Sequence, residues 1–125
     1  MIKIYHYSNQ DFRDKIKPRF FGLNGYSKNS EKSSGVKRVY FYLDRAGREY
    51  YFEGARFLYI ARVSRARLYD LNKDILRIAD NRRIKDLFSY IKRLGYIGVI
   101  GNNGFKAVCL FKAVKINKRL TLTEA

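Results

Sequence analysis

The apolar residues of this chain gather in short runs, and this spacing limits the folds that it can adopt. Six runs rich in Val, Ile, Leu, Tyr and Phe are separated by polar or glycine-containing stretches, as expected for β-strands. They cover residues Ile2–Ser8, Val36–Leu43, Phe57–Val63, Leu68–Leu71, Tyr96–Ile100 and Ala107–Ile116. Gly101 to Gly104 form a turn-prone sequence between the last two runs. The sequence therefore predicts a fold dominated by a sheet.

One stretch has the clear periodicity of a helix. Its apolar residues follow the i, i+3, i+4, i+7 pattern at Ile84, Leu87, Phe88, Ile91 and Leu94. We expect this helix to be capped by Asp80 and to stop before Gly95, and we expect shorter helices over residues 11–17, 44–54 and 72–78. Strands do not alternate regularly with long crossover helices, so the prediction is an α+β fold with a split, mixed β-sheet and short helices.

Length and composition indicate a single domain. A chain of 125 residues with 46% hydrophobic residues is long and apolar enough to bury a core. We assign residues 1–117 to the domain and expect residues 118–125 to form a polar, frayed tail. Neither a membrane-spanning run nor a signal-peptide pattern is present, so we expect a cytoplasmic monomer with no membrane association, in its own or a targeted host cell.

The net charge of the chain indicates what kind of partner it can bind. The chain has 27 Lys and Arg against 11 Asp and Glu, a net charge of +16. Such an excess favours an acidic macromolecular partner, which includes acidic proteins, nucleoproteins and nucleic acid. The alternative is that the cations only keep the surface solvated. Cys109 is the single cysteine, so a disulfide within the chain and a cysteine-based zinc site are excluded.

One histidine and two tyrosines suggest a ligand site. His6 lies in the first strand, Tyr40 lies in the second, and Tyr51 follows Tyr40 by eleven residues at the end of an expected helix. Together they can form a slot that holds a flat cationic ring such as nicotinamide. The alternatives are that the tyrosines are core residues and His6 an ordinary strand residue, or that Tyr42 and Tyr50 take over if the register slips.

The segments around these residues resemble a known family. They are Tyr5–Ser8, Val39–Asp44 with Tyr51 after it, and Leu94–Ile100 followed by Ala107–Phe111. In type and order they resemble the ADP-ribosyltransferase superfamily, in its diphtheria-toxin and poly(ADP-ribose) polymerase branch. The resemblance extends to small phage and mobile-element members, which include anti-CRISPR transferases. It covers most of the chain and implies that NAD is a substrate.

The resemblance assigns roles to individual residues. It implies that His6 hydrogen-bonds a ribose hydroxyl of NAD, and that Tyr40 and Tyr51 stack on the nicotinamide. Ser8 and the backbone of Tyr7 would hold the nicotinamide amide. The family usually has Gly at the position of Tyr7, so the tyrosine adds bulk beside this clamp.

A second departure concerns the catalytic acid. The transferases usually carry a Glu at the start of the late strand, whereas residues 101–106 of this chain contain no acid. Asn102 is our candidate to join His6, Tyr40 and Tyr51 in the catalytic centre, with Asn103 as its alternative. Glu49 and Glu53, on the expected helix, are the acids that could replace the missing Glu. NAD binding is therefore better supported than efficient catalysis.

The expected function follows from this resemblance. It implies an NAD-dependent mono-ADP-ribosyltransferase that acts on a protein or nucleoprotein acceptor, as an effector or inhibitor of phage or toxin type. Arg19, near the first loop, is our candidate for binding the NAD phosphates, and the alternative is that it is surface charge. The alternative function is a noncatalytic, basic inhibitor on the same fold that binds nucleic acid or a nucleoprotein.

Overall fold

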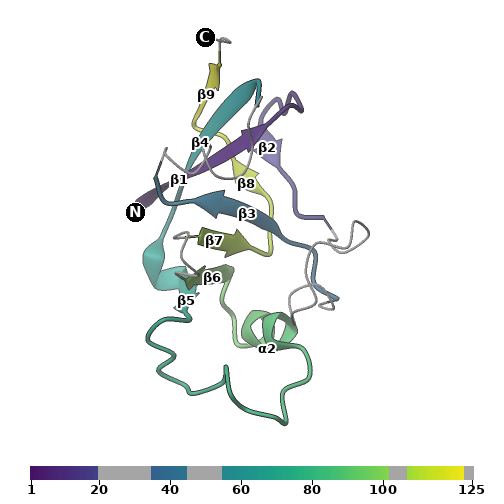
Figure 1. Cartoon of the computed structure of the whole chain (residues 1–125), viewed down its shortest axis with the longest axis vertical. Helices are drawn as coiled ribbons and strands as arrows, with labels where there is room; N and C mark the ends of the chain where they lie inside the picture. Colours follow the sequence, from purple (N-terminus) through teal and green to yellow (C-terminus); the bar gives the residue numbers. More distant parts are fainter. Residues whose placement is uncertain (20–34, 45–54, 102–106, 123–125) are drawn as a thin grey trace.

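The computed structural model describes residues 1–19, 35–44, 55–101 and 107–122. Its main element is a seven-stranded sheet in the order β5-β6-β7-β3-β1-β4-β9, beside a two-stranded ribbon of β2 and β8 (Figure 1). The strands are β1 (Ile2–Ser8), β2 (Lys15–Ile16), β3 (Val39–Tyr42), β4 (Phe57–Val63), β5 (Leu68–Asp70), β6 (Gly98–Gly101), β7 (Ala107–Leu110), β8 (Val114–Lys115) and β9 (Lys118–Thr121). The described helices are the 3₁₀ helix η1 (Arg65–Arg67) and the α-helix α2 (Leu87–Arg93).

This architecture confirms a mixed α+β fold that consists mostly of sheet. The sheet itself is mixed, because β5 and β6 pair in parallel while its other neighbouring strands are antiparallel. Within the described part of the chain, the longest helix has seven residues, and none is long and apolar enough to cross a bilayer.

Strand β1 is joined very unequally to its two neighbours. It pairs with β4 along its whole length, from Ile2 opposite Val63 to Ser8 opposite Phe57. Its pairing with β3 consists of Tyr5 opposite Tyr42 alone. By contrast, β3 pairs with β7 at all four of its residues. Among the residues that the structure describes, the sheet therefore has two well-paired parts, β5-β6-β7-β3 and β1-β4-β9, which meet at a single backbone pairing.

Apolar residues cover both faces of the sheet. One face carries a buried cluster that includes Ile4, Phe41 and Val108, and α2 covers a second cluster on the other face with Phe88 and Ile91. Alternate residues of a strand point to opposite faces, so a strand that contributes to both clusters is apolar at successive positions. Strand β7 shows this, since Val108 and Leu110 belong to the first cluster and Cys109 to the second. Strand β4 contributes Tyr59, Ala61 and Val63 to the first cluster, and all seven of its residues lie where the sequence predicts the strand.

Helix α2 begins later than the sequence suggests. Its N-cap is Asp86, whose carboxylate accepts a hydrogen bond from Ser89 N at 3.1 Å, so the predicted cap at Asp80 is wrong. The helix predicted over residues 72–78 is also absent. There Asp74 accepts hydrogen bonds from Ile78 N and Ala79 N, and Asp74 itself has a φ of 42°. These bonds satisfy the backbone without a helix.

Two other predictions from polarity are wrong. Instead of a helix over residues 11–17, Lys15 and Ile16 form β2 and pair with Lys115 and Val114 of β8. The tail predicted to fray from residue 118 forms β9, which pairs with β4. Arg119 of β9 makes an ion pair with Asp11, and its guanidinium lies 5.2 Å from the ring centre of Phe57. Polar strands of this kind lie at the edge of a sheet, where pairing needs few apolar side chains.

Candidate ligand site in the His6 cavity

The described residues form a cavity of about 450 Å³ at the end of β1. Its walls are formed by the end of β1, the segment that follows it, and the start of β3. The lining residues are His6, Gln10, Asp11, Phe12, Arg13, Lys15, Ile16, Lys17, Pro18, Arg19 and Val39. Two residues selected from the sequence, His6 and Arg19, therefore line the same cavity.

The ring of His6 is held in one orientation. Its centre lies 5.3 Å from that of Phe41 and 6.1 Å from that of Phe12. Its Nδ1 lies 2.8 Å from the backbone carbonyl oxygen of Tyr40. A carbonyl oxygen can only accept a hydrogen bond, so Nδ1 must carry the proton that it donates. In the neutral ring, Nε2 is then left as the hydrogen-bond acceptor.

The surroundings favour this neutral form of His6. Burial lowers the pKa of the imidazole, because the charged ring loses its hydration. The hydrogen bond to Tyr40 opposes this effect, and the nearby charge of Arg19 lowers the pKa further. At neutral pH the cavity therefore presents an uncharged imidazole that can accept a hydrogen bond from a hydroxyl group.

The hydroxyl of Tyr59 holds in place the segment after β1, which forms one wall of the cavity. The Tyr59 hydroxyl donates to the carbonyl oxygen of Gln10 at 2.7 Å and accepts from Phe12 N at 2.8 Å. Tyr59 is fully buried, and its ring packs edge-on against Phe12. We did not predict this role of Tyr59 from the sequence. The available signal was a tyrosine in an otherwise apolar strand, since a buried phenol needs a polar partner.

Positive charge dominates the lining of this cavity. Arg13, Lys15, Lys17 and Arg19 all line it, and its only described acid, Asp11, is paired with Arg119. Arg19 is placed by two backbone hydrogen bonds with Arg38, at 3.1 and 2.9 Å. The cavity thus combines a neutral acceptor with a cationic rim, which suits a ligand that has both hydroxyl groups and phosphates.

No family model, curated protein or solved structure matches this chain.

The structure separates the two rings that the sequence analysis placed in one slot. The His6 ring lies on the same face as Phe41, whereas the Tyr40 ring packs with the cluster under α2 on the other face. The register explains this, because Tyr5 opposite Tyr42 places the odd residues of β1 on one face with the even residues of β3. Tyr40 contributes its carbonyl oxygen to the site, and its hydroxyl accepts a hydrogen bond from Arg38 Nε at 3.2 Å.

Tyr7 and Ser8 lie at the open end of β1. The carbonyl of Ile60 accepts from Asn117 N, so the backbone of Ile60 faces β9, and Tyr5 opposite it turns its own peptide groups toward β3. The peptide groups of Tyr7, two residues further on, face the same way. The Ser8 hydroxyl accepts from Gln10 N at 3.0 Å and keeps its proton to donate.

The remaining predicted site residues lie outside the described part of the chain. These are Tyr51 and Asn102, together with the alternatives Tyr50, Asn103, Glu49 and Glu53. Among the residues that the structure describes, no group of three His, Cys, Asp or Glu side chains is placed to hold a metal ion.

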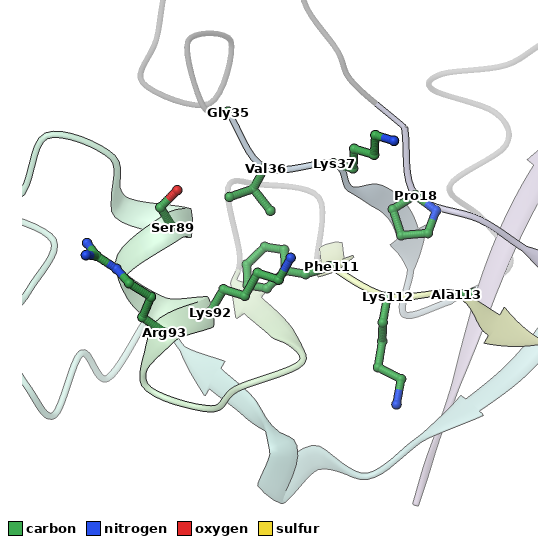
Figure 2. A pocket seen from close by; sticks show the side chains of 10 residues that line it. All are labelled: Pro18, Gly35, Val36, Lys37, Ser89, Lys92, Arg93, Phe111, Lys112 and Ala113. Carbon is green, nitrogen blue, oxygen red and sulfur yellow. The ribbon is translucent and has the colours of Figure 1, made fainter.

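A second cavity, of about 810 Å³, lies next to α2 (Figure 2). Figure 2 shows Ser89, Lys92 and Arg93 projecting from the helix on one side, while Lys37 and Lys112 come from extended segments on the other. Pro18 lines both this cavity and the His6 cavity. The described lining of the second cavity contains four cations and no carboxylate, so it can attract an anion.

Proposed function

We propose that this protein is an NAD-dependent mono-ADP-ribosyltransferase that transfers ADP-ribose to a macromolecular acceptor. The observation that supports it most is the pairing of His6 and Arg19 in one basic cavity. The Nε2 atom of His6 accepts a hydrogen bond from a ribose hydroxyl, and Arg19 with its neighbouring cations binds the pyrophosphate. A neutral imidazole does this without repelling the positive charge of the nicotinamide ring.

The reaction breaks the bond between the nicotinamide nitrogen and C1′ of the ribose. The bonding electron pair leaves with nicotinamide, which becomes neutral, and C1′ develops positive charge. A nucleophilic atom of the acceptor then bonds to C1′ and loses its proton to solvent or to a nearby base. The residues of this chain act by positioning NAD and by supporting the developing charge, with no covalent enzyme intermediate.

The end of β1 holds the nicotinamide amide in this proposal. The resemblance assigns this role to the backbone of Tyr7 and to the Ser8 hydroxyl, which has a proton to donate. We take the sheet to be the split sheet of the superfamily, and the short pairing of β1 with β3 supports this assignment. The ring of Tyr40 is left out of the nicotinamide site because it packs on the other face.

The missing acid sets the expected rate. Residues 101–106 contain no Glu or Asp, although the transferases usually place a Glu there. Removing one preorganised group that stabilises transition-state charge costs roughly 3 to 4 kcal/mol, which slows the reaction by about 10² to 10³. We therefore expect measurable NAD binding and slow nicotinamide release.

Two measurements test the proposal. Calorimetric titration with NAD measures binding, and incubation with NAD labelled in the adenylate portion measures transfer to candidate acceptors, with released nicotinamide quantified in parallel. His6→Gln should abolish release and weaken binding about tenfold or more, because it removes the ring acceptor. Arg19→Gln should also weaken binding. Lys112→Gln, which removes the same charge from the second cavity, should leave NAD affinity unchanged.

The results separate this function from its alternative. Absence of both NAD binding and nicotinamide release, at any concentration tested, would refute the proposal. NAD binding that depends on His6 but yields no nicotinamide would leave a noncatalytic NAD-binding protein. The alternative, a noncatalytic basic inhibitor, predicts nucleic-acid or nucleoprotein binding that is insensitive to NAD and to His6→Gln; the net charge of +16 favours it.

A further inference from the structure

A row of side chains crosses four neighbouring strands on the face opposite His6. The register places Tyr42 of β3 beside Tyr5 of β1, Tyr5 beside Ile60 of β4, and Ile60 beside Lys118 of β9. Neighbouring strands lie about 4.8 Å apart, so this row is about 14 Å long. The ring of Tyr42 also lies 6.2 Å from that of Tyr7, which adds a third tyrosine at one end.

The next row on the same face contains two cations. Lys3 of β1 lies directly opposite Arg62 of β4, and both side chains are exposed. Like charges in directly opposed positions destabilise a sheet. Within the described residues, neither Lys3 nor Arg62 makes an ion pair, and the same is true of Lys118. Folding alone leaves this repulsion uncompensated, whereas a bound anion would relieve it.

These side chains surround a hollow of about 510 Å³. Its lining residues are Lys3, Tyr5, Ile60, Arg62, Asn117, Lys118 and Leu120. No carboxylate is among them. We call this surface the Tyr5 face. It combines a half-buried aromatic ring and apolar side chains with three cations, and the sheet beneath holds their backbones in fixed positions.

We propose that the Tyr5 face binds single-stranded nucleic acid. An unpaired base stacks on Tyr5, and the phosphates on either side of it contact Lys3, Arg62 and Lys118. Proteins that bind single strands combine aromatic side chains, on which bases stack, with positive charge along the backbone. An acidic peptide would satisfy the cations but would leave the tyrosine ring without a planar partner.

The cavity beside α2 is a weaker candidate for such a ligand. It has cations at Lys37, Lys92, Arg93 and Lys112, but its aromatic residue, Phe111, is only 6% exposed and cannot stack on a base. The Tyr5 face is also separate from the NAD site proposed above. Tyr5 and His6 are successive residues of β1, so their side chains lie on opposite faces of the sheet. Binding to the Tyr5 face can therefore be measured without NAD.

Fluorescence anisotropy tests this proposal. The probes are short labelled oligodeoxythymidine and oligouridine, with a mixed-sequence duplex and heparin as competitors and titrations over a range of salt concentrations. The double variant Lys3→Gln/Arg62→Gln removes two charges from the Tyr5 face. Lys92→Gln/Arg93→Gln removes the same charge from α2 and is the matched control. Tyr5→Leu removes the ring, and Tyr5→Phe restores it; thermal unfolding checks that each variant is folded.

The expected result is specific to the face and to the ring. Lys3→Gln/Arg62→Gln should make the negative slope of log K against log salt shallower by about 1.4, because each phosphate contact on a single strand contributes about −0.7. The α2 variant should keep the slope of the unmodified protein. Tyr5→Leu should weaken binding about tenfold, within the range measured for one stacked base, and Tyr5→Phe should bind normally. Single strands should compete better than duplex or heparin.

Other outcomes overturn the proposal. If both double variants make the salt slope shallower by the same amount, the attraction comes from the net charge of the protein and is not localised to the Tyr5 face. If folded Tyr5→Leu binds as tightly as the unmodified protein, no base stacks there. If polyglutamate competes as well as the oligonucleotides, the partner is an acidic protein. The two oligonucleotides distinguish RNA from DNA, and either one binding through Tyr5 supports the proposal.

Discussion

The imidazole Nδ1 of His6 lies 2.8 Å from the carbonyl oxygen of Tyr40, and this side-chain bond joins β1 to β3 beyond their single backbone pairing. The bond has two effects. It keeps the proton on Nδ1, so that Nε2 is the acceptor. It also gives the backbone carbonyl of Tyr40 a hydrogen-bond donor. His6 thus supports the sheet as well as forming part of the cavity.

The state of His6 can be measured directly, because it is the only histidine in the chain. An NMR titration should show one imidazole with a pKa below 6.5, since burial disfavours the charged ring. Folding then favours neutral His6. Its contribution to stability is complete above pH 6.5 and is lost as the pH falls through the lowered pKa of the folded state. A measured pKa at or above 6.5 would contradict the burial described here.

Tyr59→Phe tests the wall of the cavity. The substitution removes a hydroxyl that bonds both Gln10 O and Phe12 N, so those two groups must find other partners. We expect a loss of about 1 to 3 kcal/mol in the free energy of unfolding, measured by urea denaturation. Tyr5→Phe is the control and should change stability by less than about 0.5 kcal/mol. Equal stability of the two variants would show that Tyr59 does not hold this wall.

Gly98→Ala tests the contact between β6 and β7. A Cβ atom at Gly98 would lie 2.1 Å from the carbonyl oxygen of Cys109, a backbone atom that cannot move without separating the strands. We expect a loss of about 3 kcal/mol in unfolding free energy, at the upper end of the usual cost of overpacking. Gly101→Ala is the matched control in the same strand, because its new Cβ atom would lie no closer than 3.6 Å to its nearest neighbour, Leu71 Cβ. Similar losses in both variants would contradict this packing.

Tyr69 should respond to alkaline pH. Burial and, next, its hydrogen bond to the Asp74 carboxylate raise the pKa of Tyr69 to about 12. The protonated phenol is favoured in the folded state, so its contribution to stability is complete below pH 10 and is lost as the pH rises toward 12. The difference in tyrosinate absorbance between the unmodified protein and Tyr69→Phe should show this late titration. A difference titration with its midpoint near pH 10 would exclude the hydrogen bond between Tyr69 and Asp74.

The strands were predictable from the sequence where burial determines the pattern. The range predicted for β4 was correct, and α2 begins within the predicted apolar stripe, because both bury apolar side chains. Predictions based on polarity were wrong at β2 and β9. Both are polar strands paired on one side, where hydrogen bonding to a distant segment outweighs local preference. A sequence read in short windows has no signal for such a partner.

The candidate site was predictable in part for a related reason. Residue types led to His6 and Arg19, which do line one cavity. The position of Tyr40 depends on the pairing of Tyr5 with Tyr42, since a shift of one residue would have placed its ring beside His6. Register is set by tertiary contacts and cannot be read from the two strands separately. The role of Tyr59 likewise depends on a segment 47 residues away in the sequence.

In the described part of the chain, the ladders β1-β4-β9 and β5-β6-β7-β3 are joined by one backbone pairing and by the apolar cluster that packs across both. Backbone amides in β1, β4 and β9 are protected by one set of ladders, and those in β3, β7 and β6 by another. Hydrogen–deuterium exchange should therefore find two cooperative units with different opening free energies. Any ligand that bridges the two units should slow exchange in both at once, which would make amide protection a label-free assay for occupancy of this junction.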